Sequence, residues 1–186
     1  MALVASIHVE NGWKMPEFTL QDAQGETHHL SALAGKKGLL VVFTCNHCPY
    51  AQAVWPRLIR HAQTLQTMGV NTVAINPNIN PRFPDDSVPE MQKKIVEWGI
   101  HFPYLVDDTQ AVAAAFDAQC TPDLYLFNGE GELFYHGRID DYWKDEARVT
   151  KEELMPAAAL MVEGAESPKV QYPTIGCSIK WFDGHH

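Results

Sequence analysis

The stretch that decides the fold runs from residue 38 to residue 69 and reads GLLVVFTCNHCPYAQAVWPRLIRHAQTLQTMG. Residues 38–44 form a continuous, partly β-branched apolar run, which is typical of a strand buried on both faces. From residue 51 onward, apolar residues recur three and four positions apart up to Gly69, which predicts a helix that Pro56 should kink. Between the two predicted elements lie Cys45 and Cys48, separated by two residues.

Strands and helices alternate along the rest of the chain. Ser87 and Glu90 form a capping box that predicts the start of one helix, and Thr150 and Glu153 form another that predicts the start of the last helix. Pro156 lies inside that last predicted helix, and the sequence pattern does not explain a proline there. Such alternation predicts an α/β sheet that is parallel at its centre and antiparallel at its edge. The predicted strands are 70–76, 103–107 and the hairpin of 123–127 with 132–137, and the predicted helices are 87–98, 108–116 and 150–161.

The composition is that of a globular protein with one core. The chain has 186 residues, of which 46% are hydrophobic and 20% charged, and its net charge is −9. Because no run of Lys and Arg exceeds two residues, we expect no binding of nucleic acid. No apolar run is long enough for a membrane span, and the N-terminus lacks the basic start of a secretory signal, so we expect no membrane association and a cytoplasmic location.

Four cysteines, at positions 45, 48, 120 and 177, are too few for a disulfide scaffold. In a reducing compartment a close pair is more often catalytic or metal-binding. Structural zinc needs four ligands, usually from two such pairs, and this chain has one pair, so we expect no metal.

The predicted strand and helix place Cys45 at the helix N-terminus, where free N–H groups and the helix dipole favour a thiolate. On this interpretation Cys45 attacks a disulfide, and Cys48, deeper in the helix, resolves the product. Asn46 and His47 would lower the pKa of Cys45 further and stabilise the reduced state. A solvated loop side chain is the alternative interpretation of His47.

Three further stretches carry a resemblance to a known family. Residues 12–43 are similar to the opening of the AhpC/TSA peroxiredoxin and redoxin group, and residues 120–141 resemble its second half. FTCNHCPY with the later PTIGCSIKWF resembles a peroxiredoxin-like group with a Cys-x-x-Cys motif. The resemblance covers about residues 10 to 182. It implies a thioredoxin-like fold, with a central mixed sheet flanked by helices and an N-terminal hairpin extension.

The same resemblance implies a domain of residues 1–164, and the apolar residues of the segment 165–186 predict a C-terminal tail packed on it. It also implies that Thr121-Pro122 occupies the place of the active-site cis-proline, where the backbone of Thr121 pairs with a bound partner chain. An ordinary proline at the entry of a strand is the alternative.

The chain departs from the peroxiredoxin pattern at two points. Those proteins have a threonine before the reactive cysteine, and its place is taken by Val42 if Cys45 is the reactive residue and by Cys45 if Cys48 is. The arginine expected before residue 123 is missing, unless Arg82 or Arg138 takes its role. The Cys48-Pro49 pair nevertheless resembles the loop around the reactive cysteine of peroxiredoxins. A peroxidase based on Cys48 is therefore the second hypothesis.

The other two cysteines and one acid are secondary candidates. Cys120 lies two residues before Pro122 and is a possible third redox sulfur or resolving thiol, and Cys177 is a possible partner for Cys120. A buried inert thiol is the commoner fate of both. Asp123 is a candidate base, although a surface carboxylate is the favoured interpretation. For Arg138, ion pairing with Asp140 or Asp141 is favoured.

Together these features predict an enzyme, a thiol-disulfide oxidoreductase with a role in antioxidant and redox homeostasis. No cofactor is expected. The expected partners are protein or small-molecule disulfides and thiols, with a dithiol protein as electron donor, and the sequence does not indicate an oligomeric state. The third hypothesis is a redox-sensing or zinc-binding module without enzymatic activity.

Overall fold

The computed structural model describes residues 2–182 of the chain and shows a seven-stranded sheet in the order β3-β2-β6-β5-β4-β8-β9. β5 runs parallel to both β4 and β6, whereas β8, β9, β2 and β3 are antiparallel to their neighbours. This confirms the predicted mixed sheet and both hairpins. The strands are β2 (Thr19–Asp22), β3 (Thr27–His29), β4 (Gly38–Phe43), β5 (Val70–Asn76), β6 (Tyr104–Val106), β8 (Asp123–Asn128) and β9 (Leu133–His136).

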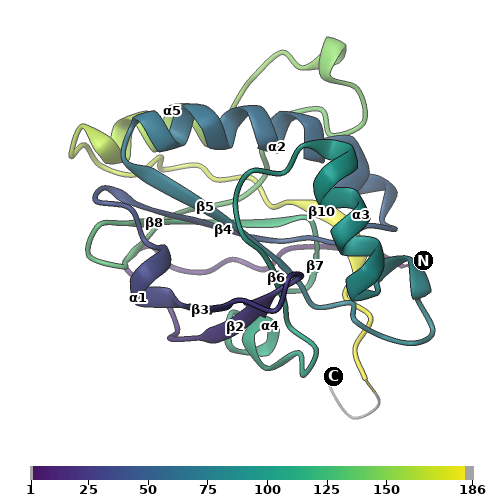
Figure 1. Cartoon of the computed structure of the whole chain (residues 1–186). Coiled ribbons are helices and arrows are strands. Elements are labelled where there is room, and N and C mark those ends of the chain that lie inside the picture. The colour runs from purple at the N-terminus through teal and green to yellow at the C-terminus, as the bar shows by residue number, and fades with distance from the viewer. Residues whose placement is uncertain (1, 183–186) are drawn as a thin grey trace.

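Helices cover both faces of this sheet. α2 and α5 lie over one face, and α1 and α4 lie over the other (Figure 1). β4 is fully buried because alternate side chains point to opposite faces: Leu40 and Val42 pack toward α2, and Leu39, Val41 and Phe43 pack on the other side. The helices are α1 (Leu30–Leu33), α2 (Pro49–Thr67), α3 (Val88–Trp98), α4 (Ala111–Ala115) and α5 (Leu154–Val162), with 3-10 turns at Pro84–Asp86 and Glu146–Arg148.

A second, three-stranded sheet brings the two ends of the described chain together. Its order is β1-β10-β7, with β1 (Leu3–Ala5), β7 (Cys120–Thr121) and β10 (Ile175–Ser178), and all pairings are antiparallel. β10 belongs to the predicted C-terminal tail, of which residues 183–186 lie outside the described residues. The chain thus returns to the strand that directly precedes Pro122.

The last helix begins later than the sequence predicts. α5 starts at Leu154, and the backbone N–H of Thr150 donates to Asp141 at 2.9 Å, so Thr150 does not cap a helix. Pro156 therefore falls in the first turn, where a proline costs no helical hydrogen bond. The later start explains a proline that the sequence pattern left unexplained.

Pro56 does lie inside α2, as predicted. Within residues 2–182, none of the helices has both the length and the apolar character that crossing a bilayer requires.

Candidate active site

The cysteine pair lies in the loop between the end of β4 and the start of α2. Cys48 is the N-cap residue of α2, and Pro49 is its first residue. The prediction that Cys45 opens the helix is therefore wrong. Proline favours the first helical position because it has no N–H to leave unpaired. Pro49 therefore sets the start of α2, which lies four residues after Cys45. Cys48, and not Cys45, is the cysteine at the helix N-terminus.

Cys45 is fully buried beneath this loop. Its Sγ lies 3.3 Å from Oγ1 of Thr121. Burial raises the pKa of Cys45 well above its ordinary value, and hydrogen bonding to Cys48 and the negative charge of Asp86 act in the same direction. The direction of this shift is opposite to the one that the sequence analysis predicted for Cys45.

Cys48 has the opposite surroundings. The pKa of Cys48 falls to about 5, because the Cys45 thiol stabilises its thiolate most, and the Cys177 thiol and the N–H of Ala51 add to this against the effect of burial. The helix N-terminus favours the same negative charge. Cys48 Sγ lies 3.2 Å from the carbonyl oxygen of Thr121 and 2.7 Å from Sγ of Cys177. These surroundings favour a negative charge on Cys48 rather than on Cys45, the sulfur predicted to attack.

Asp86 is a site residue that the sequence analysis missed. Its carboxylate is fully buried, accepts a hydrogen bond of 2.6 Å from the backbone N–H of Asn46, and contacts Nδ1 of His47. Asp86 comes from a proline-rich stretch that reads only as a loop, so no local pattern marks it. It supplies a buried acid near the dithiol that the strand before Cys45 lacks.

The His47 side chain is 11% exposed and faces Asp86, so it is not a solvated loop side chain, whereas its predicted effect on the pKa of Cys45 stays a prediction. Its ring stacks on Phe83 at 5.3 Å, and its Nε2 is buried with no hydrogen-bond partner among residues 2–182. Donor atoms of Cys45, His47 and Asp86 all lie within 4.8 Å of one another, an arrangement that could hold a metal ion. The sequence analysis, which expected no metal, counted only cysteines and histidines as zinc ligands and therefore did not consider Asp86.

The Thr121-Pro122 peptide bond is cis, as the resemblance implies. The backbone of Thr121 pairs with Cys177 of β10. The chain's own C-terminal strand thus lies against the residue that was predicted to pair with a partner chain. Partner binding by Thr121 stays a prediction.

Cys177 and Cys120 do not face each other. Cys177 lies opposite Thr121, and Cys120 lies opposite the next residue, Ser178, so the two cysteines project from opposite faces of the small sheet. Cys120 Sγ instead lies 3.7 Å from the carbonyl oxygen of Pro122, and burial raises the pKa of Cys120. The predicted Cys120–Cys177 pair is therefore replaced by a contact between Cys177 and Cys48.

Two charged residues lie in surroundings that the sequence analysis did not favour. Asp123 is fully buried, 2.8 Å from Nε2 of His136 and 3.1 Å from the hydroxyl of Tyr125, and is no surface carboxylate. Arg138 pairs with Glu153 at 2.5 Å and not with its neighbouring aspartates.

Asp140 pairs instead with the buried Arg57 at 2.7 Å, and Arg82 is exposed. None of the hydrogen bonds of Arg57 or Arg138 within residues 2–182 involves a cysteine. In the described part of the chain, neither Arg57 nor Arg138 takes the place of the peroxiredoxin arginine beside the dithiol.

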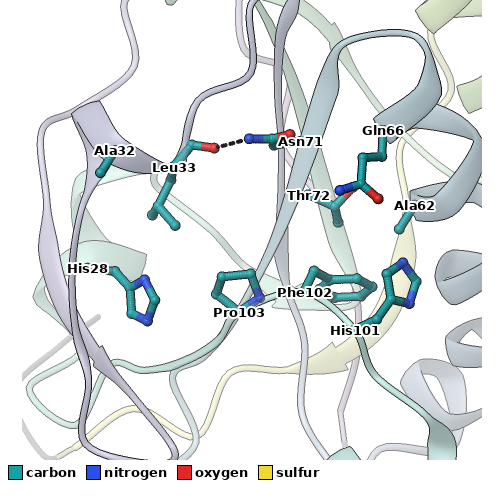
Figure 2. Close-up of a pocket in the computed structure, with 10 residues that line it drawn as sticks. All are labelled: His28, Ala32, Leu33, Ala62, Gln66, Asn71, Thr72, His101, Phe102 and Pro103. Carbon is teal, nitrogen blue, oxygen red and sulfur yellow. Dashed lines mark hydrogen bonds between the residues drawn. The ribbon is translucent and has the colours of Figure 1, made fainter.

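A polar pocket elsewhere on the molecule is separate from the cysteines. Figure 2 shows its lining, which includes His28, His101, Asn71 and Thr72, with Asn71 donating to the carbonyl of Leu33 at 2.8 Å. Asn71 and Thr72 lie near the start of β5, whereas the cysteine loop follows the end of β4, which runs parallel to β5. The pocket and the dithiol therefore lie at different ends of these strands.

Residues 12–136 match the model of the AhpC/TSA family. The chain belongs to the AhpC/TSA family. It is 38% identical to an uncharacterized conserved protein from Geobacillus kaustophilus, with a TM-score of 0.94 over 100% of this chain and 99% of that one. The thioredoxin domain of a thiol-disulfide oxidoreductase from Bacteroides vulgatus matches 69% of this chain and 89% of its own, with 19% identity and a TM-score of 0.58. The fold is accordingly thioredoxin-like, as predicted.

A curated relative of this AhpC/TSA protein is the thiol-disulfide oxidoreductase ResA of Bacillus subtilis. The two are 26% identical over 125 residues, which is 67% of this chain and 65% of ResA. This chain thus spans just under two thirds of the length of that relative.

Proposed function

We propose that this protein catalyses thiol-disulfide exchange, with Cys48 as the attacking thiolate and Cys45 as its partner thiol. The observation that carries the proposal is the paired environment of the two sulfurs: Cys48 at the start of α2 has a pKa of about 5, and Cys45 beside it keeps its proton. A low-pKa thiolate next to a protonated thiol is the arrangement that disulfide exchange requires. The name of the related ResA supports this activity.

The reaction follows from these positions. The Cys48 thiolate attacks one sulfur of a substrate disulfide, whose S–S bond breaks, and one substrate sulfur leaves as a thiolate and takes up a proton. Cys45 then loses its proton and attacks Sγ of Cys48, which releases the second substrate thiol and leaves a Cys45–Cys48 disulfide. The carboxylate of Asp86, within 4.8 Å of Cys45 Sγ, is the base placed to accept that proton. A dithiol protein restores the two thiols.

The proposed substrates are protein or small-molecule disulfides. A cytoplasmic location and an antioxidant role stay predictions.

Reduction of insulin by dithiothreitol tests the activity and the assignment of the two sulfurs together. We expect the wild-type protein to accelerate the reaction, Cys48→Ser to abolish the acceleration, and Cys45→Ser to weaken it while Cys48 still forms disulfides. Cys120→Ser is the matched control, because Cys120 is equally buried but lies against Pro122, and we expect it to keep its activity. Full activity of Cys48→Ser would refute the proposal.

A thiol peroxidase is the second candidate, because the ionised cysteine is the one that precedes Pro49. Both sulfurs of the pair are also fully buried, so a small oxidant can reach them more easily than a protein can. Loss of hydrogen peroxide in the presence of protein and dithiothreitol separates the two functions. A fast loss that depends on Cys48 and persists in Cys45→Ser would favour the peroxidase.

A further inference from the structure

A third sulfur lies against the proposed nucleophile. Cys177 Sγ is 2.7 Å from Cys48 Sγ, and both residues are buried, with 3% and 0% of their surface exposed. A disulfide bond is about 2.05 Å long, so less than about 1 Å of further approach would join the two atoms. The dithiol mechanism described above has no use for this third thiol.

The position of Cys177 is fixed by the backbone on both sides. β10 pairs with β1, where Cys177 lies opposite Leu3, and with β7, where it lies opposite Thr121. Gly176 allows this close approach, since a Cβ there would lie 2.2 Å from the carbonyl oxygen of Thr121. Strand pairing, rather than a flexible tail, therefore holds this sulfur beside the start of α2.

We propose that Cys177 is a second resolving thiol, which forms a disulfide with Cys48. The proposal rests on the proposed function, because it assumes that Cys48 attacks disulfides. It adds an alternative product, a Cys48–Cys177 disulfide that links the start of α2 to β10.

The electrons balance as in ordinary exchange. The Cys48 thiolate attacks a disulfide and forms a mixed disulfide, and the first substrate sulfur leaves as a thiol after taking up a proton. The Cys177 thiol gives its proton to solvent and attacks Sγ of Cys48, and the bond between Cys48 and the substrate breaks. The second substrate thiol leaves, so two protein thiols are oxidised to one disulfide and the substrate disulfide is reduced to two thiols.

The charge on Cys48 controls when Cys177 can act. Burial raises the pKa of Cys177 to about 12, and the neighbouring Cys48 contributes to this rise, while Lys180 opposes it. Once Cys48 is held in a mixed disulfide its negative charge is gone, and that contribution ends. Cys177 is therefore easier to ionise at the step at which it is needed.

Trapping with oxidised glutathione tests the proposal in a background without Cys45. Reduced Cys45→Ser protein is mixed with oxidised glutathione, quenched in acid, unfolded with N-ethylmaleimide and mapped by mass spectrometry. We expect a Cys48–Cys177 disulfide, with at least tenfold less Cys48–glutathione adduct than in Cys45→Ser/Cys177→Ser. Cys45→Ser/Cys120→Ser is the matched control and should behave like Cys45→Ser.

Equal accumulation of the Cys48–glutathione adduct with and without Cys177 would overturn the proposal and leave exchange at Cys48 intact. If neither adduct nor disulfide forms at Cys48 in any variant, the proposed function fails as well. Cys177→Ala replaces Cys177→Ser if the serine variant does not fold.

A variant that keeps every sulfur gives an independent measurement. Gly176→Ala in the Cys45→Ser background should push β10 away from Thr121, so the glutathione adduct should increase at the expense of the Cys48–Cys177 disulfide. An unchanged product ratio, with the alanine variant folded, would contradict the role given to β10.

Discussion

Cys45 and Cys48 are three positions apart in the chain, and the folded protein gives them opposite electrostatic surroundings. Cys48 caps α2 and meets donors, whereas Cys45 is buried with the carboxylate of Asp86 nearby. The sequence predicted a cysteine at the helix start, and the residue in that place is Cys48 rather than Cys45. The difference comes from Pro49, which fixes the first helical residue, and from Asp86, which is 38 or more positions away from either cysteine and has no local signal.

Asp86→Asn tests the contribution of this carboxylate at the residue scale. Removal of its charge should lower the pKa of Cys45, because the negative charge of Asp86 raises that pKa in addition to the effect of burial. The free energy of unfolding should fall by about 1 to 3 kcal/mol, because the buried His47 loses its charged partner. Absorbance of the thiolate at alkaline pH, in a Cys48→Ser background, measures the pKa.

Asp22→Asn is the matched control for that measurement, because Asp22 also pairs with a histidine, His28 at 2.8 Å, but does not contribute to the pKa of Cys45. The account of Cys45 would be refuted if both asparagine variants left its titration unchanged.

At the scale of elements, periodicity predicted most strands and helices, and side-chain chemistry decided where they end. The alternating and continuous apolar runs became β4, β5, β6 and the hairpin of β8 and β9. The start of α5 was placed four residues too early, because Thr150 bonds to Asp141, and this contact is invisible in the local pattern.

Arg57 is the charged residue on the buried face of α2 that links this helix to the segment after β9. Its side chain is 3% exposed, pairs with Asp140 at 2.7 Å and donates to the carbonyls of Tyr142 and Trp143 at 3.1 and 2.5 Å. Arg57→Met leaves a buried carboxylate without its partner, so the free energy of unfolding should fall by about 3 to 5 kcal/mol. Equilibrium unfolding in guanidinium chloride measures the loss.

The exposed ion pair of Lys14 with Glu132 provides the comparison, since the Lys14 side chain is 66% exposed. Lys14→Ala should cost less than about 1 kcal/mol. A cost for Arg57→Met no larger than that of Lys14→Ala would show that the buried pair does not hold α2 in place.

At the scale of the whole molecule, the site is assembled from four separate parts of the chain. The loop after β4 supplies Cys45 and Cys48, the turn before α3 supplies Asp86, the loop between β7 and β8 supplies the cis-proline, and β10 supplies Cys177. The sequence predicted the first and third parts from a motif and a family resemblance. It could not predict the convergence of the others, because contacts between distant segments leave no period in the sequence.

The low pKa of Cys48 also predicts how the stability of the reduced protein depends on pH. The folded-state pKa is about 5 and the ordinary value is 9.0, so between these limits the unfolded chain binds more protons than the folded protein. The contribution of Cys48 to stability therefore grows as the pH rises from about 5 to 9 and is lost as the pH falls toward 5. Guanidinium unfolding at pH 6 and pH 8 should show a larger gain for the wild type than for Cys48→Ser, and equal gains would contradict the assignment.

The most direct test of the account is the absorbance of the thiolate near 240 nm during a pH titration of the reduced protein and its two single serine variants. The account predicts a transition near pH 5 that is absent in Cys48→Ser. In Cys45→Ser the transition should persist at a higher pH, because the Cys45 thiol contributes most to the lowered pKa of Cys48. A transition that disappears in Cys45→Ser and persists in Cys48→Ser would contradict the account.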